Sequence, residues 1–515
     1  MDALLSQSEV DKKIEEVVAP LREELIRARA TIEEAKRTIK SLLQHIHGVK
    51  SERGSIVLTA EGQQFLDPTW VNGAERPQPA APAETPEKER TPRDRRGVAQ
   101  RHPHLPITPI DGPLPEALRQ QVETGDLAVR RTGRFDDSLV VPQAKPYIRR
   151  VFEIEVVNPA KNEALLQVPL PDRIVPDGVL ADESIHELTI AKFLDAIPFH
   201  RTLKAWSRNR LDIARQVVND AFAAWSGCFK PLADTIIEQV FQSAVVHADE
   251  SWARLQAEKH CEKVNIWTVV GGGQVGYRYT ADRNHARAQE IIPSGFTGYL
   301  VTDAWQGWAK LEQIINAGCN AHARRPFAKE ADLSASDGAQ NPDAALIVEL
   351  YAEIYRLEHA ALEGPPEELL DRRRRILQEH SNSVMERIRK EAERIACSYS
   401  FSHPLAEGGR YIINHYDKLI LFLDNPLLPP DNNAAENALR INALIRKNSL
   451  FFGSEEGGER AAIALTVLHS CRIANVEPHG YLAEITPKLL LHRRGIKQDL
   501  VQLTPKAIAD SRKLS

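Results

Sequence analysis

Cysteine is scarce in this chain of 515 residues, and the five cysteines lie far apart with no C-x-x-C spacing. That pattern argues against a zinc knuckle and against a disulfide framework, and a reducing cytoplasm suits it best. Long apolar runs are also missing, and the first residues, MDALLSQSEV, have neither a basic flank nor an apolar core. We therefore expect a cytoplasmic protein that is neither exported nor membrane-spanning.

An excess of positive charge is absent as well. The formal net charge is −5, although 27% of the residues are charged. The molecule as a whole is therefore not a basic sheath for nucleic acid, and any DNA-binding surface must be local. The length suggests about three or four folding units.

The N-terminal segment carries a heptad pattern. Apolar residues from Ile14 to Val49 follow one another at alternating steps of four and three, which is the a/d pattern of a coiled coil. Pro20 and Gly48 bound the part that is predicted to be a continuous helix. We expect residues 1–54 to self-associate through this helix, although a helix that folds back on its own chain would have the same pattern.

A proline-rich stretch follows. Residues 55–145 are predicted to be a flexible linker, because segments such as ERPQPAAPAETPEKERTPRDRR cannot bury a core. Arginines in this stretch can contact DNA phosphates, but charge in a linker is more often solvated. In residues 146–180, the segment from Tyr147 to Pro171 alternates like paired strands and predicts a small β-rich module without zinc.

Residues 181–240 contain three amphipathic patterns, SIHELTIAKFLDAI, PFHRTLKAWSRNR and DIARQVVNDAFAAW. Pro198 and Asp212 are the predicted starts of the second and third helices. The second pattern is basic, includes Arg208 and Arg210, and resembles the helix of a helix-turn-helix that enters the major groove of DNA. The alternative is that these helices only pack on a neighbouring element.

Two aspartates follow apolar strand patterns in residues 241–328. The run from Ala244 to Val246 precedes Asp249, and the run from Tyr299 to Val301 precedes Asp303. Between them, VNIWTVVGGGQVGYRYT predicts a hairpin and HARAQEII a short helix. The three glycines are not a phosphate-binding loop, because no Lys-Ser or Lys-Thr pair follows them. The order is therefore strand with Asp, two strands, helix, strand with Asp.

A third acid, Glu436, stands in DNNAAENALR within residues 429–475, after a helical insertion predicted for residues 329–428. Aspartates at neighbouring strand ends and a later acid on a helix suit two Mg²⁺ ions, or Mn²⁺, in phosphoryl transfer, because these ions prefer oxygen ligands. The alternative is that Asn433 caps the helix and Glu436 closes a capping box. The predicted packing stripe starts at Ala434, on a different side of this helix from Glu436.

Six motifs in fixed order resemble those of the insertion sequence 66 family of transposases, namely HADES, GYLVTDAWQGW, GCNAHARRPF, DNNAAENALR, RKNSLFFGSEEGGERAA and EPHGYL. The resemblance implies an α/β core with a ribonuclease-H-like mixed sheet and a large helical insertion. It also implies a DDE triad in which Asp249, Asp303 and Glu436 are both catalytic and metal-binding. The N-terminal coiled coil and the small helical DNA-binding region would flank this core.

The activity that the resemblance implies is DNA transposition. Hydrolysis would expose the 3′-hydroxyl ends of the element, which would then attack target DNA in line. The implied partners are double-stranded DNA, both terminal inverted repeats and target, and accessory proteins of the element. The enzyme would be bacterial and would associate with the nucleoid when bound to DNA.

Basic residues near these acids are candidates for contacts with DNA phosphates or with a flipped DNA end. They are His322, Arg324 and Arg325 in NAHARRPF, and Arg440, Arg446 and Lys447 after Glu436. The alternative for the first three is a structural salt-bridge cluster. Arg440 is one helical turn from Glu436, so an ion pair between the two is the alternative there.

The chain departs from the family pattern in three places. It has no cysteine before Cys228, where relatives commonly carry a zinc-binding segment, Asn437 replaces the usual arginine after the helix glutamate, and residues 476–515 end unlike the family. None of these changes affects the three acids, so we expect an active enzyme. The other hypotheses are a catalytically silent descendant that binds DNA and oligomerises, and a nuclease that cuts without joining.

Deletion of Met1 to Gly54 is expected to lower the oligomeric state, because it removes the predicted coiled-coil seam. Light scattering coupled to size-exclusion chromatography would measure the mass in solution. A deletion of similar length within the proline-rich linker is the control and should leave the number of subunits unchanged. An unchanged number of subunits after the first deletion would contradict the prediction.

Overall fold

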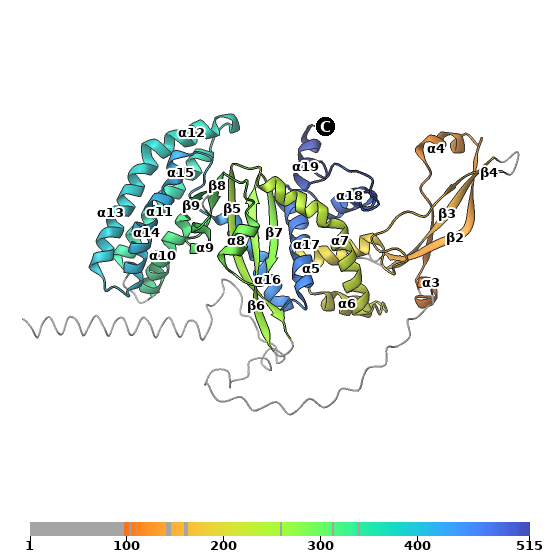
Figure 1. Cartoon of the computed structure of the whole chain (residues 1–515), viewed down its shortest axis with the longest axis horizontal. Helices are drawn as coiled ribbons and strands as arrows, with labels where there is room; N and C mark the ends of the chain where they lie inside the picture. The colour runs from red at the N-terminus through yellow and green to blue at the C-terminus, as the bar shows by residue number, and fades with distance from the viewer. Residues whose placement is uncertain are drawn as a thin grey trace, which may run out of the picture. The chain divides into compact units, whose positions relative to one another are not determined.

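The computed structural model of the chain describes residues 97–514, except for residues 104, 141–145, 159–162, 258–259, 312–313 and 337–339 (Figure 1). The predicted coiled-coil helix and the first part of the predicted linker lie outside the described residues. Within the described part of the chain, no helix combines the length and the apolar character needed to cross a membrane.

A four-stranded sheet lies in the N-terminal third of the described chain. It consists of β1 (Ile107–Asp111), β2 (Ala128–Val140), β3 (Tyr147–Asn158) and β4 (Glu163–Val168), with α3 (Val98–Arg101) and α4 (Glu116–Glu123) before β1 and β2. Strand β3 pairs with the other three, in parallel with β1 and antiparallel with β2 and β4.

The prediction that residues 55–145 are linker is therefore wrong for residues 107–140, which supply β1 and β2. Strand β2 is mostly polar, and ion pairs across the strands help to hold it against β3. Arg130 lies 2.8 Å from Glu155, and Arg150 lies 2.8 Å from Asp137. An exposed strand with charged cross-strand pairs lacks the apolar alternation by which a strand is recognised in a sequence.

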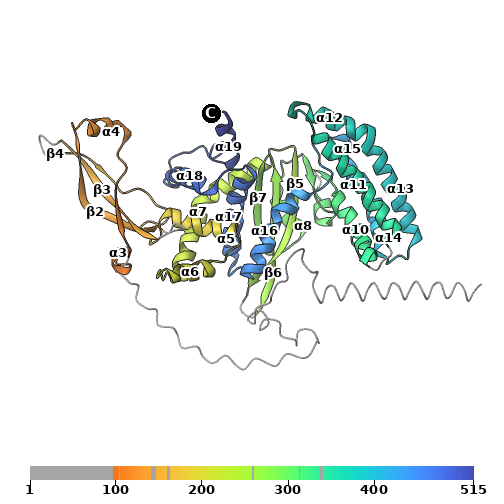
Figure 2. The ribbon, with the colours of Figure 1, turned by 180° about the vertical axis from the view of Figure 1, so that it is seen from behind.

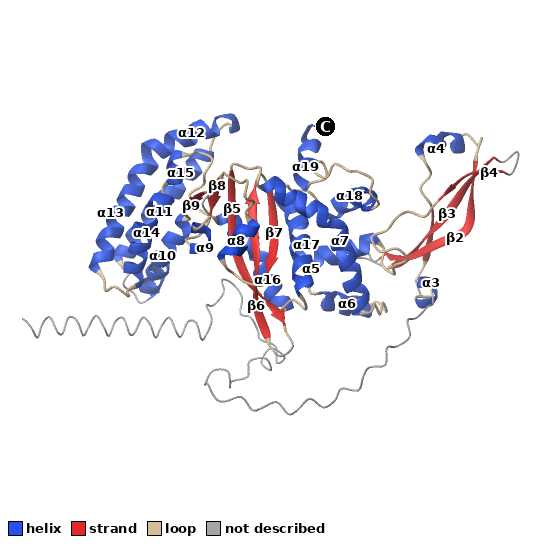
Figure 3. Cartoon of the chain, in the orientation of Figure 1, coloured by secondary structure: helices blue, strands red, loops and turns tan. Residues whose placement is uncertain are grey.

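A second, five-stranded sheet has the order β7-β6-β5-β8-β9 (Figure 3). Its strands are β5 (Val245–Gln256), β6 (Cys261–Gly271), β7 (Gln274–Thr280), β8 (Tyr299–Val301) and β9 (Ile315–Ala317). Strands β5, β6 and β7 are antiparallel, whereas β8 and β9 run parallel to β5. The sheet is thus mixed, with helices on its parallel crossovers, and the chain has an α/β core.

Asp249 lies inside β5 and not at its end, which corrects the expectation from the sequence. The hairpin with β6 pairs every residue from His247 to Gln256, so the strand continues well past the aspartate. Strand β8, however, pairs only with Val245 to His247. Asp249 therefore sits just beyond the point where the parallel neighbour stops.

Helices cover both faces of this sheet (Figures 1 and 2). The helices around it are α5 (Asp182–Phe193), α6 (Phe199–Arg208), α7 (Arg215–Val240), α8 (His285–Ile291), α9 (Gln306–Ala309), α16 (Asn433–Ser449), α17 (Glu455–Ile473), α18 (Pro478–Arg493) and α19 (Pro505–Leu514). On one face, Trp267 and Val246 pack with Ala288 of α8. On the other, Ile266 and Tyr277 pack in one core with residues of α16 and α17. The sheet is therefore buried on both sides.

Helix α7 is much longer than the short third helix that the sequence predicts, because its apolar face continues from Trp225 to Val240. The rings of Trp225 and Phe229 are stacked with their centroids 4.2 Å apart, and both side chains are fully buried. The three-helix region therefore packs into the main core. Its basic residues Arg208 and Arg210 are exposed at the end of α6.

Residues between β9 and α16 form a helical subdomain with its own core. Its helices are α10 (Asn320–Ser336), α11 (Pro342–Leu362), the 3-10 turn Pro366–Glu368, α12 (Leu369–Ile376), a π-helical turn Leu377–Ser381, α13 (Asn382–Ser398), α14 (Pro404–Leu419) and α15 (Leu421–Asp424). Phe327, Ile354 and Ile388 are fully buried in it, and the same cluster reaches Val301 and Ala317 of the sheet. Helices thus occupy the range in which the sequence predicts an insertion.

The packing stripe of α16 differs from the expected one. The buried residues of its first half are Ala435 and Leu439, whereas Ala434 is exposed. The C-terminal tail, whose role the sequence left open, belongs to the fold. Tyr481 of α18 is fully buried and its hydroxyl donates to the carbonyl of Leu503 at 2.7 Å.

Substitution of Gly276 by alanine is expected to lower stability by about 1–3 kcal/mol through overpacking. A Cβ atom at this position in β7 would lie 2.4 Å from Cγ1 of Ile237 in α7. Gly295→Ala is the matched control, since a Cβ there meets nothing within 4 Å. Thermal melting of both variants would measure the effect, and equal melting temperatures would count against this packing.

Candidate active site

The three acids singled out from the sequence are brought together by two strands and one helix. Asp249 lies in β5, Asp303 lies two residues after β8, and Glu436 lies in the first turn of α16. Backbone amides fix the two aspartates, because the N–H of Glu250 donates to Asp249 Oδ1 at 2.8 Å and that of Trp305 donates to Asp303 Oδ1 at 3.0 Å.

The electrostatics of Asp249 reflect this convergence. Burial, together with the charges of Asp303 and Glu436, raises the pKa of Asp249 to about 7, while a backbone hydrogen bond and the charge of Arg283 act in the opposite direction. Like charges disfavour ionisation only at short range. The carboxylates of Asp303 and Glu436 therefore lie close enough to Asp249 for their charges to act on it.

Glu250 is a fourth buried acid that the sequence reasoning missed. Burial raises its pKa to about 8, Asp249 and Asp303 add to the shift, and Arg283, which forms an ion pair with Glu250, opposes it. Neighbouring residues of a strand point to opposite faces, so Glu250 faces away from α16 and Glu436. Within the described residues, its Oε2 atom has no hydrogen-bond partner. The signal in the sequence that could have revealed Glu250 is its place next to Asp249 in the HADES motif.

Glu436 contacts residues of the helical subdomain. His322 Nδ1 and Arg325 Nη2, both from α10, lie 3.2 Å and 3.3 Å from Glu436 Oε1. The histidine contact lacks the geometry of a hydrogen bond. Burial lowers the pKa of His322, with the charge of Arg325 lowering it further and those of Glu436 and Asp303 opposing the shift.

The start of α16 is not a capping box. The residue before the helix is Asn432, and Asn433, the predicted cap, is its first residue. The side chain of Asn432 is fully buried and bonds to β5 instead of to the helix. Its Nδ2 donates to the carbonyl of Ala248 at 2.8 Å, and its Oδ1 lies 3.1 Å from His247 Nδ1. Asn432 is therefore a positioning residue that holds the helix carrying Glu436 against the strand carrying Asp249.

A cysteine, Cys319, lies close to Glu436. Ligand atoms of Cys319, His322 and Glu436 all lie within 4.8 Å of one another. Burial raises the pKa of the Cys319 thiol to about 11, and its sulfur accepts a hydrogen bond from the backbone N–H of Asn432 at 3.2 Å. A protonated thiol is a poor metal ligand. The carboxylates of Asp249, Asp303 and Glu436, by contrast, offer the oxygen donors that Mg²⁺ and Mn²⁺ prefer. A hard cation therefore suits these three acids better than zinc suits the cysteine-containing group.

Some of the basic candidates contact a neighbouring side chain, whereas others are exposed and do not contact the acids. Arg325 is 61% exposed beside Glu436, and Arg446 near the other end of α16 lies over the Trp252 ring at 3.9 Å. Arg440 and Lys447 are exposed and, in the described part of the chain, form no ion pair with Glu436. The alternative pairing of Arg440 with Glu436 is therefore wrong, because Arg325 and His322 take that place. Arg324 lies on α10 too, and its Nε is buried with no hydrogen-bond partner among the described residues.

Comparison with known proteins identifies the family. The profile of the transposase IS66 family matches residues 178–460, which is more than half of the chain. The chain belongs to the IS66 transposase family. In this IS66-family chain, the matched range contains all three acids and the helical subdomain, and it leaves out the small sheet and helices α18 and α19.

Three relatives from Sinorhizobium fredii (strain NBRC 101917 / NGR234) are similar over long ranges, and each is described only as an uncharacterized protein. Protein y4hP is 28% identical over 353 residues, which cover 64% of this chain and 63% of the relative. Protein y4jD is 24% identical over 72% of this chain and 75% of its own length, and y4qI is 25% identical over 88% and 85%. The chain thus spans slightly less than two thirds of y4hP.

Replacement of Asp249 by asparagine is expected to stabilise the metal-free protein in a pH-dependent way. The folded-state pKa of about 7 lies above 3.8, the ordinary pKa of an aspartate, so between these pH values the folded state binds more protons than the unfolded state. Stability of the wild type therefore falls as the pH rises through this window. Asp249→Asn does not lose stability in this way. Its free energy of unfolding should therefore exceed that of the wild type by an amount that grows from about pH 4 to about pH 7 and then levels off.

Urea unfolding in the presence of EDTA at several pH values would measure this difference. Asp212→Asn, at an exposed position, is the control. An advantage of Asp249→Asn that is the same at every pH would show that the carboxylate is not in a destabilising environment.

Proposed function

We propose that this transposase is a DDE enzyme with a ribonuclease-H-like core, which cleaves the ends of its element and joins them to target DNA. The observation that carries the proposal is the placement of Asp249 in β5, Asp303 after the neighbouring strand β8 and Glu436 on α16, which Asn432 holds against β5. The charges of Asp303 and Glu436 act on the carboxylate of Asp249. The strand order β7-β6-β5-β8-β9, with an antiparallel and a parallel half, supports the ribonuclease-H-like assignment.

Asp249, Asp303 and Glu436 would hold two Mg²⁺ or Mn²⁺ ions. Bound there, the ions would polarise the attacking water or 3′-hydroxyl and stabilise the leaving oxygen. The carboxylates suit this role because they are oxygen donors and because Asp249 lacks an ion-pair partner within the described residues. Asn432 keeps Glu436 opposite β5, and the two backbone amides keep the aspartates in fixed rotamers.

The cations around the acids are suited to DNA phosphates. His322, Arg324 and Arg325 lie on α10 beside Glu436, and Arg440, Arg446 and Lys447 lie further along α16. Such residues would fix the register of the substrate without reading its sequence. Arg208 and Arg210, exposed at the end of α6, would bind DNA further from the acids. We further propose that the N-terminal coiled coil links subunits, that accessory proteins of the element take part, and that the enzyme works at the bacterial nucleoid.

Replacement of Asp249 or Glu436 by its amide is expected to lower metal-dependent cleavage about a thousandfold, which corresponds to about 4 kcal/mol of transition-state stabilisation. The substrate is a supercoiled plasmid that carries the DNA flanking this reading frame on both sides, incubated with MgCl₂ or EDTA. Glu455→Gln is the matched control, since Glu455 also lies in the first turn of a helix but is exposed. Undiminished cleavage by Asp249→Asn would refute the triad.

A further inference from the structure

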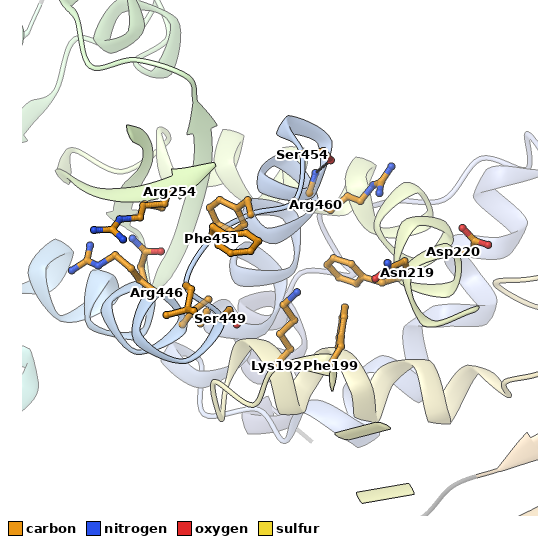
Figure 4. A pocket seen from close by; sticks show the side chains of 18 of the residues that line it. Lys192, Phe199, Asn219, Asp220, Arg254, Arg446, Ser449, Phe451, Ser454 and Arg460 are labelled. Carbon is orange, nitrogen blue, oxygen red and sulfur yellow. Dashed lines mark hydrogen bonds between the residues drawn. The ribbon is translucent and has the colours of Figure 1, made fainter. Parts of the chain in front are cut away.

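A cavity of about 520 Å³ lies on the α16 face of the core, away from the three acids. Residues of α5, α6, α7, β5, α16 and the loop into α17 line it (Figure 4). Part of its wall is aromatic, with Phe199, Phe222, Phe451 and Phe452. This combination of a sizeable hollow and several rings is typical of a site for a flat organic group.

The cavity is also strongly cationic. Four basic side chains line it, Lys192, Arg254, Arg446 and Arg460, against one carboxylate, Asp220. That carboxylate already accepts a hydrogen bond from Gln216 at 2.7 Å. The first-turn glutamates of α17 do not line the cavity. The charge of the site therefore calls for an anionic ligand.

Of these cations, Lys192 gives the strongest argument for an anionic ligand. In Figure 4 its side chain rises from α5 toward the middle of the cavity. Its ammonium lies 4.0 Å from the centre of the Phe199 ring and 5.7 Å from that of Phe222, and it has no hydrogen-bond or ion-pair partner among the described residues. Burial lowers its pKa to about 8. The half-buried ammonium therefore lies against aromatic rings without an anionic partner among the described residues, and an incoming phosphate would supply one.

The rim of the cavity presents apolar surface to solvent. Leu450 and Phe451, which line the cavity, are 56% and 43% exposed. Trp252 is 39% exposed and does not line the cavity, but it contacts two arginines that do. The guanidinium groups of Arg254 and Arg446 both lie near the Trp252 ring, at 5.7 Å and 3.9 Å from its centre. Leu450 has a φ of 66°, a left-handed conformation that leucine rarely adopts and that often marks functional loops. Exposed rings flanked by arginines are the usual surface for unpaired bases.

We propose that this cavity binds one unpaired nucleotide of the DNA substrate, with its base against the exposed ring of Phe451 and its phosphate near Lys192 and Arg460. The proposal rests on the function proposed above. Strand β5 leads from Asp249 to Arg254 and α16 leads from Glu436 to Arg446, each over about 15 Å at the usual rise per residue. A strand whose end lies at the acids would reach the cavity after about four or five nucleotides at duplex spacing.

The test uses the full chain and fluorescein-labelled hairpin DNAs that are either blunt or carry a 3′ extension of five thymidines. Fluorescence anisotropy in EDTA measures binding without cleavage. The extended hairpin is expected to bind about tenfold more tightly than the blunt one, and one abasic position in the extension should remove that gain while others do not. Free thymidine monophosphate is added as a competitor. If it displaces the extended hairpin, the cavity binds single nucleotides; if it does not, the nucleotide must belong to a connected strand.

Lys192→Met and Arg460→Gln are expected to reduce the tenfold preference to about twofold or less. Arg472→Gln is the matched control, because Arg472 is an exposed arginine at the other end of α17 and does not line the cavity. Equal preference in Lys192→Met and the wild type, or tight binding of a fully abasic extension, would overturn the proposal. Metal-dependent cleavage of the plasmid is scored separately, so a loss of the base-binding site and a failure of the transposase chemistry give different results.

Discussion

The site depends on one buried amide. Asn432 has no exposed surface, and its side chain bonds to Ala248 and His247 of β5 while its backbone N–H bonds to the sulfur of Cys319. A buried amide is tolerable only when its donors and acceptors are satisfied, so these bonds fix the start of α16 in one place. That place is beside the middle of β5, where β8 no longer pairs. Glu436, one turn into the helix, therefore faces the strand that carries Asp249.

Holding these acids together is costly. Burial is the largest cause of the raised pKa of Asp249, about 7, and the nearby charges of Asp303 and Glu436 add to it. The surrounding cations relieve only part of the charge. Arg325 contacts Glu436, and Arg283 pairs with Glu250 on the other face of the strand while its charge also acts on Asp249. A fold gains nothing in stability from such an arrangement, and clusters of this kind are common where a cation or a proton takes part in function.

Short hydrophobic and glycine patterns in the sequence predicted several strands, turns and helices correctly. The apolar runs before Asp249 and Asp303 are in β5 and β8, the glycine turn joins β6 to β7, and HARAQEII begins α8. The packing of α16 was predicted correctly at Ile441 and Ile445 but one residue out of place in its first half, because Ala434 and Ala435 are equally apolar and only the facing strand decides between them. Strands β1 and β2 were missed because charged pairs across the sheet leave no apolar alternation.

Contacts distant in sequence could not be predicted in the same way. The contact between Glu436 and Arg325 joins residues 111 positions apart, and the bond from Asn432 to Ala248 joins residues 184 apart. Both depend on where the helical subdomain returns the chain to the sheet, which no short motif encodes. A sequence can suggest which acids belong together, whereas the groups that orient them are found only when the tertiary fold is known.

The acids and the cavity lie along the same two elements, which constrains how they can work together. Helix α16 has Glu436 in its first turn and Arg446 in its last, and Arg446 contacts Ser251 and the Trp252 ring of β5. The helix is thus attached to the strand at both ends, by Asn432 and by Arg446. A regular helix transmits a displacement with little bending. Glu436 and the cavity residue Arg446 are therefore both held to strand β5 through the same helix.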